Sequence, residues 1–183
     1  MRFGIFIYDG VEPIDLATFG VLSMARRIAP EISICTIAPK AGSVALANGL
    51  TVTADYGIDD APACDVVIVT GGMILAASGV LDHGPATTKR EVVPPETSPV
   101  AVMRETYPQI DVREAMLVER PDGMVTGGGV TLCIDTTLHL LGQMLGEDVA
   151  NETARIMEYS RAWRANREAF APVLSSSRPV RAE

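Results

Sequence analysis

Apolar residues occur along this chain in short runs separated by turn residues. The runs at 2–8, 32–38 and 66–69 are nearly unbroken and rich in Ile, Val and Phe. Strands with one face in water alternate apolar and polar residues, whereas unbroken runs are typical of strands covered on both faces, as in a parallel sheet. We therefore predict three buried strands, ended by turns such as Asp9-Gly10 and Gly71-Gly72.

Longer segments with helical character lie between and after these strands. Asn48-Gly49 predicts a hairpin within 44–56. Helices are predicted over about 14–29 (opened by Pro13), 130–145 and 149–167. Strands that alternate with helices indicate an α/β domain with a mainly parallel sheet.

The pattern is weaker between the third strand and the helix at 130–145. Ala86-Thr87-Thr88 is compatible with a strand, and the segments 115–118 and 124–126 flank a turn and favour two more. Prolines at 94, 95 and 99 argue against a helix through 92–104, although a helical turn begun after Pro99 is compatible with them.

Composition places the chain among globular proteins. It has 183 residues, of which 48% are hydrophobic and 21% charged, so one domain over 1–172 is expected, followed by a flexible tail at 173–183. The net charge of −8 argues against nonspecific binding of nucleic acid. No apolar run approaches the roughly 20 residues that span a bilayer, and no signal peptide is evident, which indicates a cytoplasmic protein.

The cysteines and histidines give little sign of chemistry. Cys35, Cys64 and Cys133 are widely spaced and odd in number, which argues against a disulfide framework or a structural zinc site. His83 and His139 are the only histidines, so we predict no metal and no cofactor. Cys133 is the best placed of three weak nucleophile candidates because it lies near a predicted helix start.

Asp15 is the first candidate for a functional residue. It lies just beyond the carboxyl end of the first predicted strand, where open α/β sheets bind ligands. A partly desolvated carboxylate there is suited to proton transfer. The alternative is a structural carboxylate that interacts with the free N–H groups of a helix start.

Two glycine segments also follow predicted strands. The backbone N–H groups of Gly71 and Gly72 would stabilise a developing oxyanion, although a tight turn also needs glycine. The segment Gly127-Gly128-Gly129 opens a helix, as anion-binding loops do, but it lacks the lysine of a phosphate loop. Close backbone packing is the simpler interpretation.

Taken in order, these motifs resemble the ThiJ/PfpI superfamily of class I glutamine-amidotransferase-like proteins. Within it, the chain is most similar to isocyanide hydratases and to the amidotransferase-like domain of AraC-type regulators. The resemblance extends over about residues 2–160 and rests on the segments 5–11 with 14–16, 65–72, 75–82, 86–88 and 126–131 with Ile134-Asp135.

The resemblance implies a fold and a set of roles. The fold would be flavodoxin-like, with a doubly wound sheet, helices on both faces and a single domain. Asp15 corresponds to the acidic residue that hydrogen-bonds a catalytic cysteine, and Gly71 or Gly72 to the oxyanion loop. A homodimer that acts on a small molecule is also implied.

The cysteine that this resemblance requires is not in the sequence. Relatives carry it on a strand-to-helix elbow directly before the segment that here begins at Met73, yet Gly72 passes straight into Met73. By this resemblance, the residues absent between Gly72 and Met73 would form a helix and a central strand. Even a minimal crossover between parallel strands takes about 10–12 residues. Either the natural protein has a segment here that this sequence omits, or the segment has been deleted. Lys89 also stands where several relatives have a histidine.

Two functions are compatible with these observations. The first is a cysteine-dependent hydratase or hydrolase of a small molecule, resembling isocyanide hydratase, with its nucleophile outside the 183 residues. The second is a non-catalytic sensor or binding domain related to those of AraC-type regulators. No helix-turn-helix pair is predicted after residue 170, and the acidic charge argues against direct DNA binding.

Overall fold

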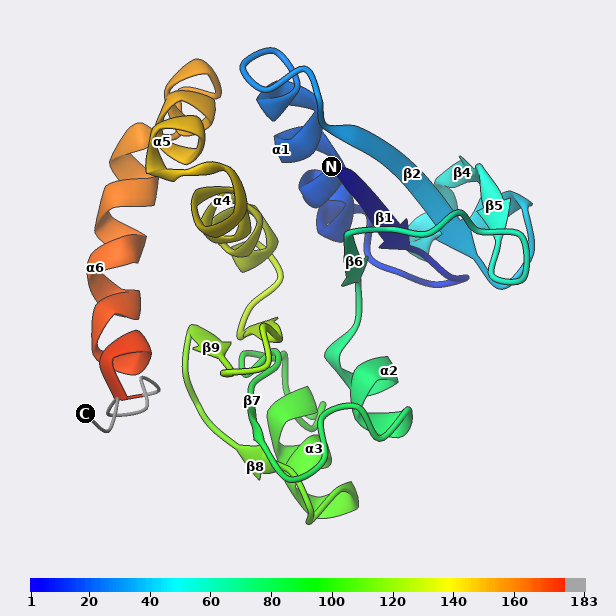
Figure 1. The fold of residues 1–183 in the computed structure, drawn as a ribbon. Coiled ribbons are helices and arrows are strands. Elements are labelled where there is room, and N and C mark those ends of the chain that lie inside the picture. Colours follow the sequence, from blue (N-terminus) through cyan, green and yellow to red (C-terminus); the bar gives the residue numbers. More distant parts are fainter. Residues whose placement is uncertain (177–183) are drawn as a thin grey trace. The chain divides into compact units, whose positions relative to one another are not determined.

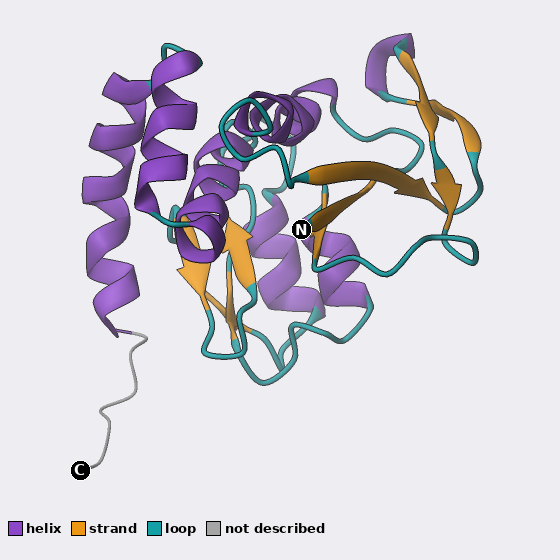
Figure 2. Cartoon of the chain, turned by 45° about the horizontal axis from the view of Figure 1, so that its top comes forward, coloured by secondary structure: helices purple, strands orange, loops and turns teal. Residues whose placement is uncertain are grey.

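The computed structural model describes residues 1–176 of the chain, which form an α/β fold (Figures 1 and 2). Contacts between residues divide the chain into two compact units. Unit 1 comprises Met1–Gly71 and Thr137–Ser160, and unit 2 comprises Gly72–Thr136 and the segment from Arg161 onward. The first boundary therefore falls between Gly71 and Gly72, one residue before the junction at which the sequence lacks an elbow.

Unit 1 contains a parallel sheet of four strands in the order β5-β2-β1-β6. The bounds are β1 (Arg2–Phe6), β2 (Ser33–Ala38), β5 (Tyr56–Gly57) and β6 (Val66–Val69). The three apolar runs are therefore strands, and their parallel pairing confirms the predicted sheet type. β1 pairs with β2 on one side and β6 on the other, and its Phe3 and Ile5 have no exposed surface.

The hairpin predicted at Asn48-Gly49 is also present in unit 1. β3 (Gly42–Ala45) and β4 (Thr51–Ala54) pair antiparallel, with η2 (Ala47–Gly49) between them. Asn48 and Gly49 both have a positive φ, of 61° and 87°, and these two residue types adopt that conformation readily. The pair therefore supplies the backbone reversal that its sequence predicts.

The helix predicted over 14–29 is shorter in the structure. Pro13 opens a 3-10 turn, η1 (Pro13–Leu16), and the α-helix α1 covers only Ala17–Ala25. Residues 26–29 continue as hydrogen-bonded turns, for example from the Ala29 N–H to the Ala25 carbonyl at 2.9 Å. Apolar periodicity does not distinguish such turns from a helix, which explains the difference.

A single helix over 149–167 was the wrong prediction, because the structure has two helices there. α5 (Glu147–Ile156) ends before Glu158, whose φ of 57° interrupts the helix, and α6 begins at Ser160. α5 packs on α1 within unit 1. α6 extends to Ser176, into the segment predicted as a tail, while 177–183 lie outside the described residues. α4 (Leu132–Leu145) matches the helix predicted over 130–145.

Unit 2 has no extended sheet among its described residues. Its strands form two separate pairs, β7 (Pro85–Ala86) with β8 (Asp111–Val112) in parallel, and β9 (Leu117–Glu119) with β10 (Val125–Gly127) antiparallel. Thr87 and Thr88 lie outside β7, and the Thr87 N–H donates to Thr126 Oγ1 (3.0 Å). A small core holds the unit together and consists of Ala76, Leu81, Ala86, Met103 and Ile110.

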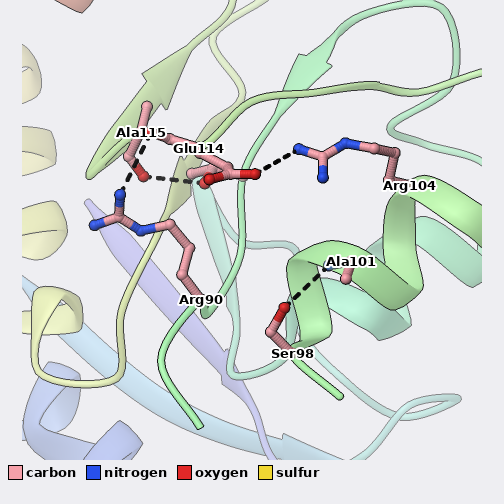
Figure 3. Close-up of polar contacts among 7 residues, drawn as sticks. Arg90, Ser98, Ala101, Arg104, Glu114 and Ala115 are labelled. Carbon is pink, nitrogen blue, oxygen red and sulfur yellow. Dashed lines mark hydrogen bonds and ion pairs between the residues drawn. The ribbon is translucent and has the colours of Figure 1, made fainter.

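The helix α3 (Pro99–Thr106) begins where the sequence allowed a helical turn. Ser98 is its N-cap, and the Ser98 hydroxyl accepts a hydrogen bond from the Ala101 N–H at 3.4 Å (Figure 3). At the other end of the helix, Arg104 forms an ion pair with Glu114 at 3.0 Å. Arg90 donates to the Glu114 carbonyl at 3.5 Å, so this loop is held from two sides.

Candidate functional site

Asp15 lies in the 3-10 turn η1, shortly after β1 ends. Pro13 occupies the first position of this turn, and the Asp15 N–H donates to the Glu12 carbonyl at 3.0 Å. The Asp15 side chain is partly buried, whereas neighbouring Ile14 is 45% exposed. The carboxylate therefore stands near the carboxyl end of β1, at the edge where parallel sheets bind ligands.

Tyr8, which the sequence analysis did not select, links Asp15 to the end of β6. Tyr8 follows β1, is partly buried, and donates from its hydroxyl to the Thr70 carbonyl at 3.0 Å. Burial raises the pKa of the Tyr8 hydroxyl, and the negative charge of Asp15 raises that pKa further. Asp15 is thus close enough to act on Tyr8 electrostatically. A tyrosine directly before the Asp9-Gly10 turn was the available signal.

Gly71 lies close to the same hydroxyl. A Cβ atom at Gly71 would lie 2.6 Å from the Tyr8 hydroxyl oxygen, so only glycine fits beside Tyr8 in this arrangement. Thr70 is buried and its hydroxyl donates to the Phe6 carbonyl at 2.9 Å, which fixes the end of β6 against β1. The structure therefore brings Asp15, Tyr8 and Gly71 together within unit 1.

Gly72 has a different environment, because it begins α2 (Gly72–Ala77) in unit 2. A Cβ atom there would lie 2.8 Å from Thr88 Oγ1. Thr88 is itself buried, so close packing explains this glycine. An oxyanion role for Gly72 stays a prediction.

Several other residues named from the sequence lie in unit 2, where they make hydrogen bonds and close backbone contacts. The Thr87 hydroxyl donates to the Ala115 carbonyl at 3.0 Å, and the Lys89 carbonyl accepts from the Val100 N–H at 3.0 Å. A Cβ atom at Gly128 would collide with the Ala115 carbonyl oxygen. These contacts support backbone packing as the reason for the glycines at 127–129.

The cysteines of unit 1 are separate from the candidate site, because Cys35 lies within β2 and Cys64 before β6, whereas Tyr8 and Gly71 follow the ends of β1 and β6. The Sγ atoms of Cys35 and Cys64 are 3.9 Å apart, and all three cysteines of the chain are thiols. Cys133 belongs to unit 2. Within the described part of the chain, no group of three or more His, Cys, Asp or Glu residues is arranged to hold a metal ion. No helix within residues 1–176 combines the length and apolar character that crossing a membrane requires.

Comparisons with known proteins identify the fold. No family model and no curated protein sequence matches the chain. A ThiJ/PfpI family protein from Pseudomonas syringae superposes with a TM-score of 0.71 at 16% identity, covering 96% of this chain and 88% of the other. An AraC family transcriptional regulator from Pseudomonas putida gives 0.68 at 16% identity, covering 85% and 98%. Drosophila melanogaster DJ-1beta gives 0.68 at 14% identity, covering 85% and 96%.

Proposed function

We propose that this chain, which has the fold of the DJ-1/ThiJ/PfpI superfamily, binds a small electrophilic molecule at the carboxyl ends of β1 and β6. In the natural protein, Asp15 would transfer protons there for a cysteine-dependent hydratase or hydrolase that resembles isocyanide hydratase. One observation carries the proposal. The charge of Asp15 acts on Tyr8, whose hydroxyl reaches the end of β6 beside Gly71.

Each residue has a distinct role in this mechanism. The cysteine thiolate attacks the electrophilic carbon of the substrate, and negative charge develops on the atom bonded to that carbon. Asp15 accepts the thiol proton and returns it to the substrate. Water then adds to the same carbon, the carbon–sulfur bond breaks, and the product leaves as the thiol regains a proton. Backbone N–H groups at Gly71 and Gly72 stabilise the developing charge. Tyr8 holds the end of β6 in place through its hydrogen bond to the Thr70 carbonyl.

The surroundings of β6 support a missing segment between Gly72 and Met73. Among the described strands β6 pairs with β1 alone, and its Val67 side chain is 59% exposed. An exposed apolar edge strand favours pairing with other strands, because its N–H and C=O groups lack partners on that side. A strand supplied by an additional segment would pair with this edge, whereas a true deletion leaves it bare.

The first experiment determines whether the natural protein has this segment. Peptide mapping of the protein from its natural source is expected to recover extra residues, including a cysteine, between Gly72 and Met73. An intact mass equal to the 19.4 kDa of these 183 residues would exclude catalysis by a cysteine at an elbow.

The second experiment tests Asp15 in that natural protein. Turnover of an isocyanide and of an amide should fall about 100-fold or more in Asp15→Asn, since a positioned acid or base contributes about 10²–10⁴-fold. Asp59→Asn is the matched control because Asp59 is exposed in a turn after β5. Equal rates in wild type and Asp15→Asn would refute the role of Asp15.

A second candidate function is a non-catalytic sensor or binding domain. The structural similarity to an AraC family regulator favours it, as does the placement of Cys35 within β2 and of Cys64 before β6, since neither follows the carboxyl end of a strand as Tyr8 and Gly71 do. This function predicts binding of a small molecule that Asp15→Asn weakens, with no turnover by wild type. Calorimetric titration beside the turnover assay separates the two functions. A homodimer remains our expectation, which sedimentation analysis tests.

A further inference from the structure

Two thiols from different elements meet inside unit 1, on β2 and in the segment before β6. Cys35 lies in β2 and is only 6% exposed, while Cys64 precedes β6 and is partly buried. Their Sγ atoms are 3.9 Å apart, although the residues are 29 positions apart in sequence. β1 runs between β2 and β6, so this contact crosses a strand.

Gly4 of β1 makes the contact sterically feasible. Gly4 is the register partner of Cys35 in the β1–β2 pairing. A Cβ atom on Gly4 would lie 2.8 Å from Cys64 Sγ and 2.9 Å from Ile37 Cδ1, which is closer than real Cβ atoms approach. The missing side chain leaves a space over β1, and Cys64 uses this space to reach Cys35.

We propose that Cys35 and Cys64 form a redox-active dithiol, which a peroxide oxidises to an intramolecular disulfide that joins β2 to the segment before β6. A disulfide needs its sulfur atoms about 2.05 Å apart, so the two must approach by roughly 2 Å. Cys64 lies outside regular secondary structure, and its Sγ is held by a 3.3 Å contact to the Pro62 carbonyl. Rotation of this side chain with a small backbone shift supplies the movement.

The chemistry balances with hydrogen peroxide as the oxidant. Cys64 Sγ attacks one peroxide oxygen, the O–O bond breaks, and the other oxygen leaves as water after taking up a proton. Cys35 Sγ then attacks the sulfenic sulfur of Cys64. The S–S bond forms, the S–O bond breaks, and the hydroxide leaves as water with the proton from Cys35. The two thiols lose two electrons and the peroxide is reduced to two waters.

Exposure assigns the order of these steps. Cys64 is the more accessible thiol and meets the oxidant first, whereas buried Cys35 resolves the sulfenic acid. Burial, reinforced by the contact with Cys64, raises the pKa of Cys35 from 9.0 to about 11. Cys35 is therefore protonated near neutral pH and must give up its proton as it attacks the sulfenic sulfur, so the cross-link should form faster at alkaline pH.

This inference is independent of the proposed function. Cys64 precedes β6 and Cys35 lies within β2, whereas Tyr8 and Gly71 follow the carboxyl ends of β1 and β6, so the two sites share no residue. Loss of activity in Asp15→Asn would leave the disulfide unaffected, and a failed cross-link would say nothing about Asp15. The two proposals can therefore fail separately.

Oxidation of the folded 183-residue chain followed by thiol counting tests the dithiol. The protein is treated with hydrogen peroxide, denatured, alkylated with N-ethylmaleimide and digested. Wild type is expected to lose two of its three alkylation sites and to yield one peptide pair linked through Cys35 and Cys64, which a reductant separates. Alkylation of all three cysteines, oxygen addition to Cys64 with Cys35 intact, or linkage to Cys133 would each overturn the proposal.

Variants provide matched controls for the same assay. Cys133→Ala should form the same linked peptide pair, and Cys64→Ala should retain both remaining alkylation sites. Cys35→Ala should form no linked pair but should gain oxygen at Cys64, because the sulfenic acid then has no resolving thiol. Gly4→Ala should slow the cross-link several-fold, because its Cβ occupies the space that Cys64 needs. Unchanged cross-linking in Gly4→Ala would contradict the geometry. If a cysteine variant does not fold, peptide mapping of wild type alone decides the question.

Discussion

β1 and β6 are neighbouring parallel strands with similar apolar sequences, yet their surroundings differ. β1 has partners on both sides, and its Phe3 and Ile5 are fully buried. β6 has one partner among the described strands, and Val67 at its centre is 59% exposed. Similar apolar sequences therefore do not fix how deeply a strand is buried, because burial depends on the elements that the rest of the chain packs against it.

Truncation of one apolar side chain in each strand should give the largest contrast. Ile5→Ala is expected to lower the free energy of unfolding by about 2–5 kcal/mol, because it leaves a cavity in a packed core. Val67→Ala should change that free energy by only about 0.5 kcal/mol, as exposed positions do. Urea unfolding of both variants measures the difference. A large loss in Val67→Ala would mean that a partner or another segment covers β6.

A double-mutant cycle examines how the ends of the two strands are joined. Gly71→Ala should cost about 1–2 kcal/mol, since its Cβ displaces the Tyr8 hydroxyl and leaves the Thr70 carbonyl without its hydrogen bond. In a Tyr8→Phe background the same change should cost much less, because the nearest remaining ring atom is 3.4 Å away. Chemical denaturation of the four proteins gives the coupling energy. Additive effects would contradict the contact.

Alkaline pH should weaken the hydrogen bond between the Tyr8 hydroxyl and the Thr70 carbonyl. Burial, and secondly the Asp15 charge, raise the pKa of Tyr8 above 10.0. The folded state therefore favours the protonated phenol, and this contribution to stability is present below pH 10 and lost as pH rises through the higher folded-state pKa. Tyr8→Phe should remove this part of the alkaline loss of stability.

Phenolate absorbance provides the direct measurement for Tyr8. Asp15→Asn should lower the pKa of Tyr8 part of the way, because burial, the larger cause, remains. Subtracting the titration of Tyr8→Phe from that of each protein isolates the Tyr8 signal. A Tyr8 titration that Asp15→Asn leaves unchanged would separate the two residues and remove the main support for the candidate site.

The smallest effect on stability is expected from a charge on the open edge. Val67→Lys should leave the free energy of unfolding within about 0.5 kcal/mol of wild type, because Val67 is exposed. It should reduce self-association seen by light scattering, since lysine on an edge strand discourages pairing between chains. Unchanged self-association would show that β6 is not the surface through which copies meet.

Local signals in the sequence predicted the regular elements better than their interruptions. The apolar runs gave the strands of the sheet, and Asn48-Gly49 gave the hairpin, because these depend on nearby residues. The break between α5 and α6 could not be predicted, since Glu158 adopts a positive φ that its residue type does not signal. The contact between Cys35 and Cys64 could not be predicted either, because the two residues are 29 positions apart and meet over Gly4 on a third element.

The candidate site was predicted in part for the same reason. Asp15 and Gly71 were identifiable because residues at the carboxyl ends of parallel strands lie at one edge of the sheet. Tyr8 was missed because its place at the end of an apolar run indicates only the last residue of a strand. Its role depends on a hydrogen bond to Thr70, which is 62 positions away in the sequence. Gly72 was grouped with Gly71 by sequence, whereas the structure gives it a packing role beside Thr88.

Each of the two units consists of two separate segments of the chain, and this limits where the chain can be cut or interrupted by an insertion. Unit 1 needs Met1–Gly71 together with Thr137–Ser160, and the second piece supplies α5, whose Ala150 and Ala154 are fully buried. Expression of residues 1–71 alone would leave α1 without its helical partner. A reporter or a cleavage site is therefore better placed in the exposed turn at Asp59-Asp60 than at Gly71-Gly72, even though the latter marks a boundary between units.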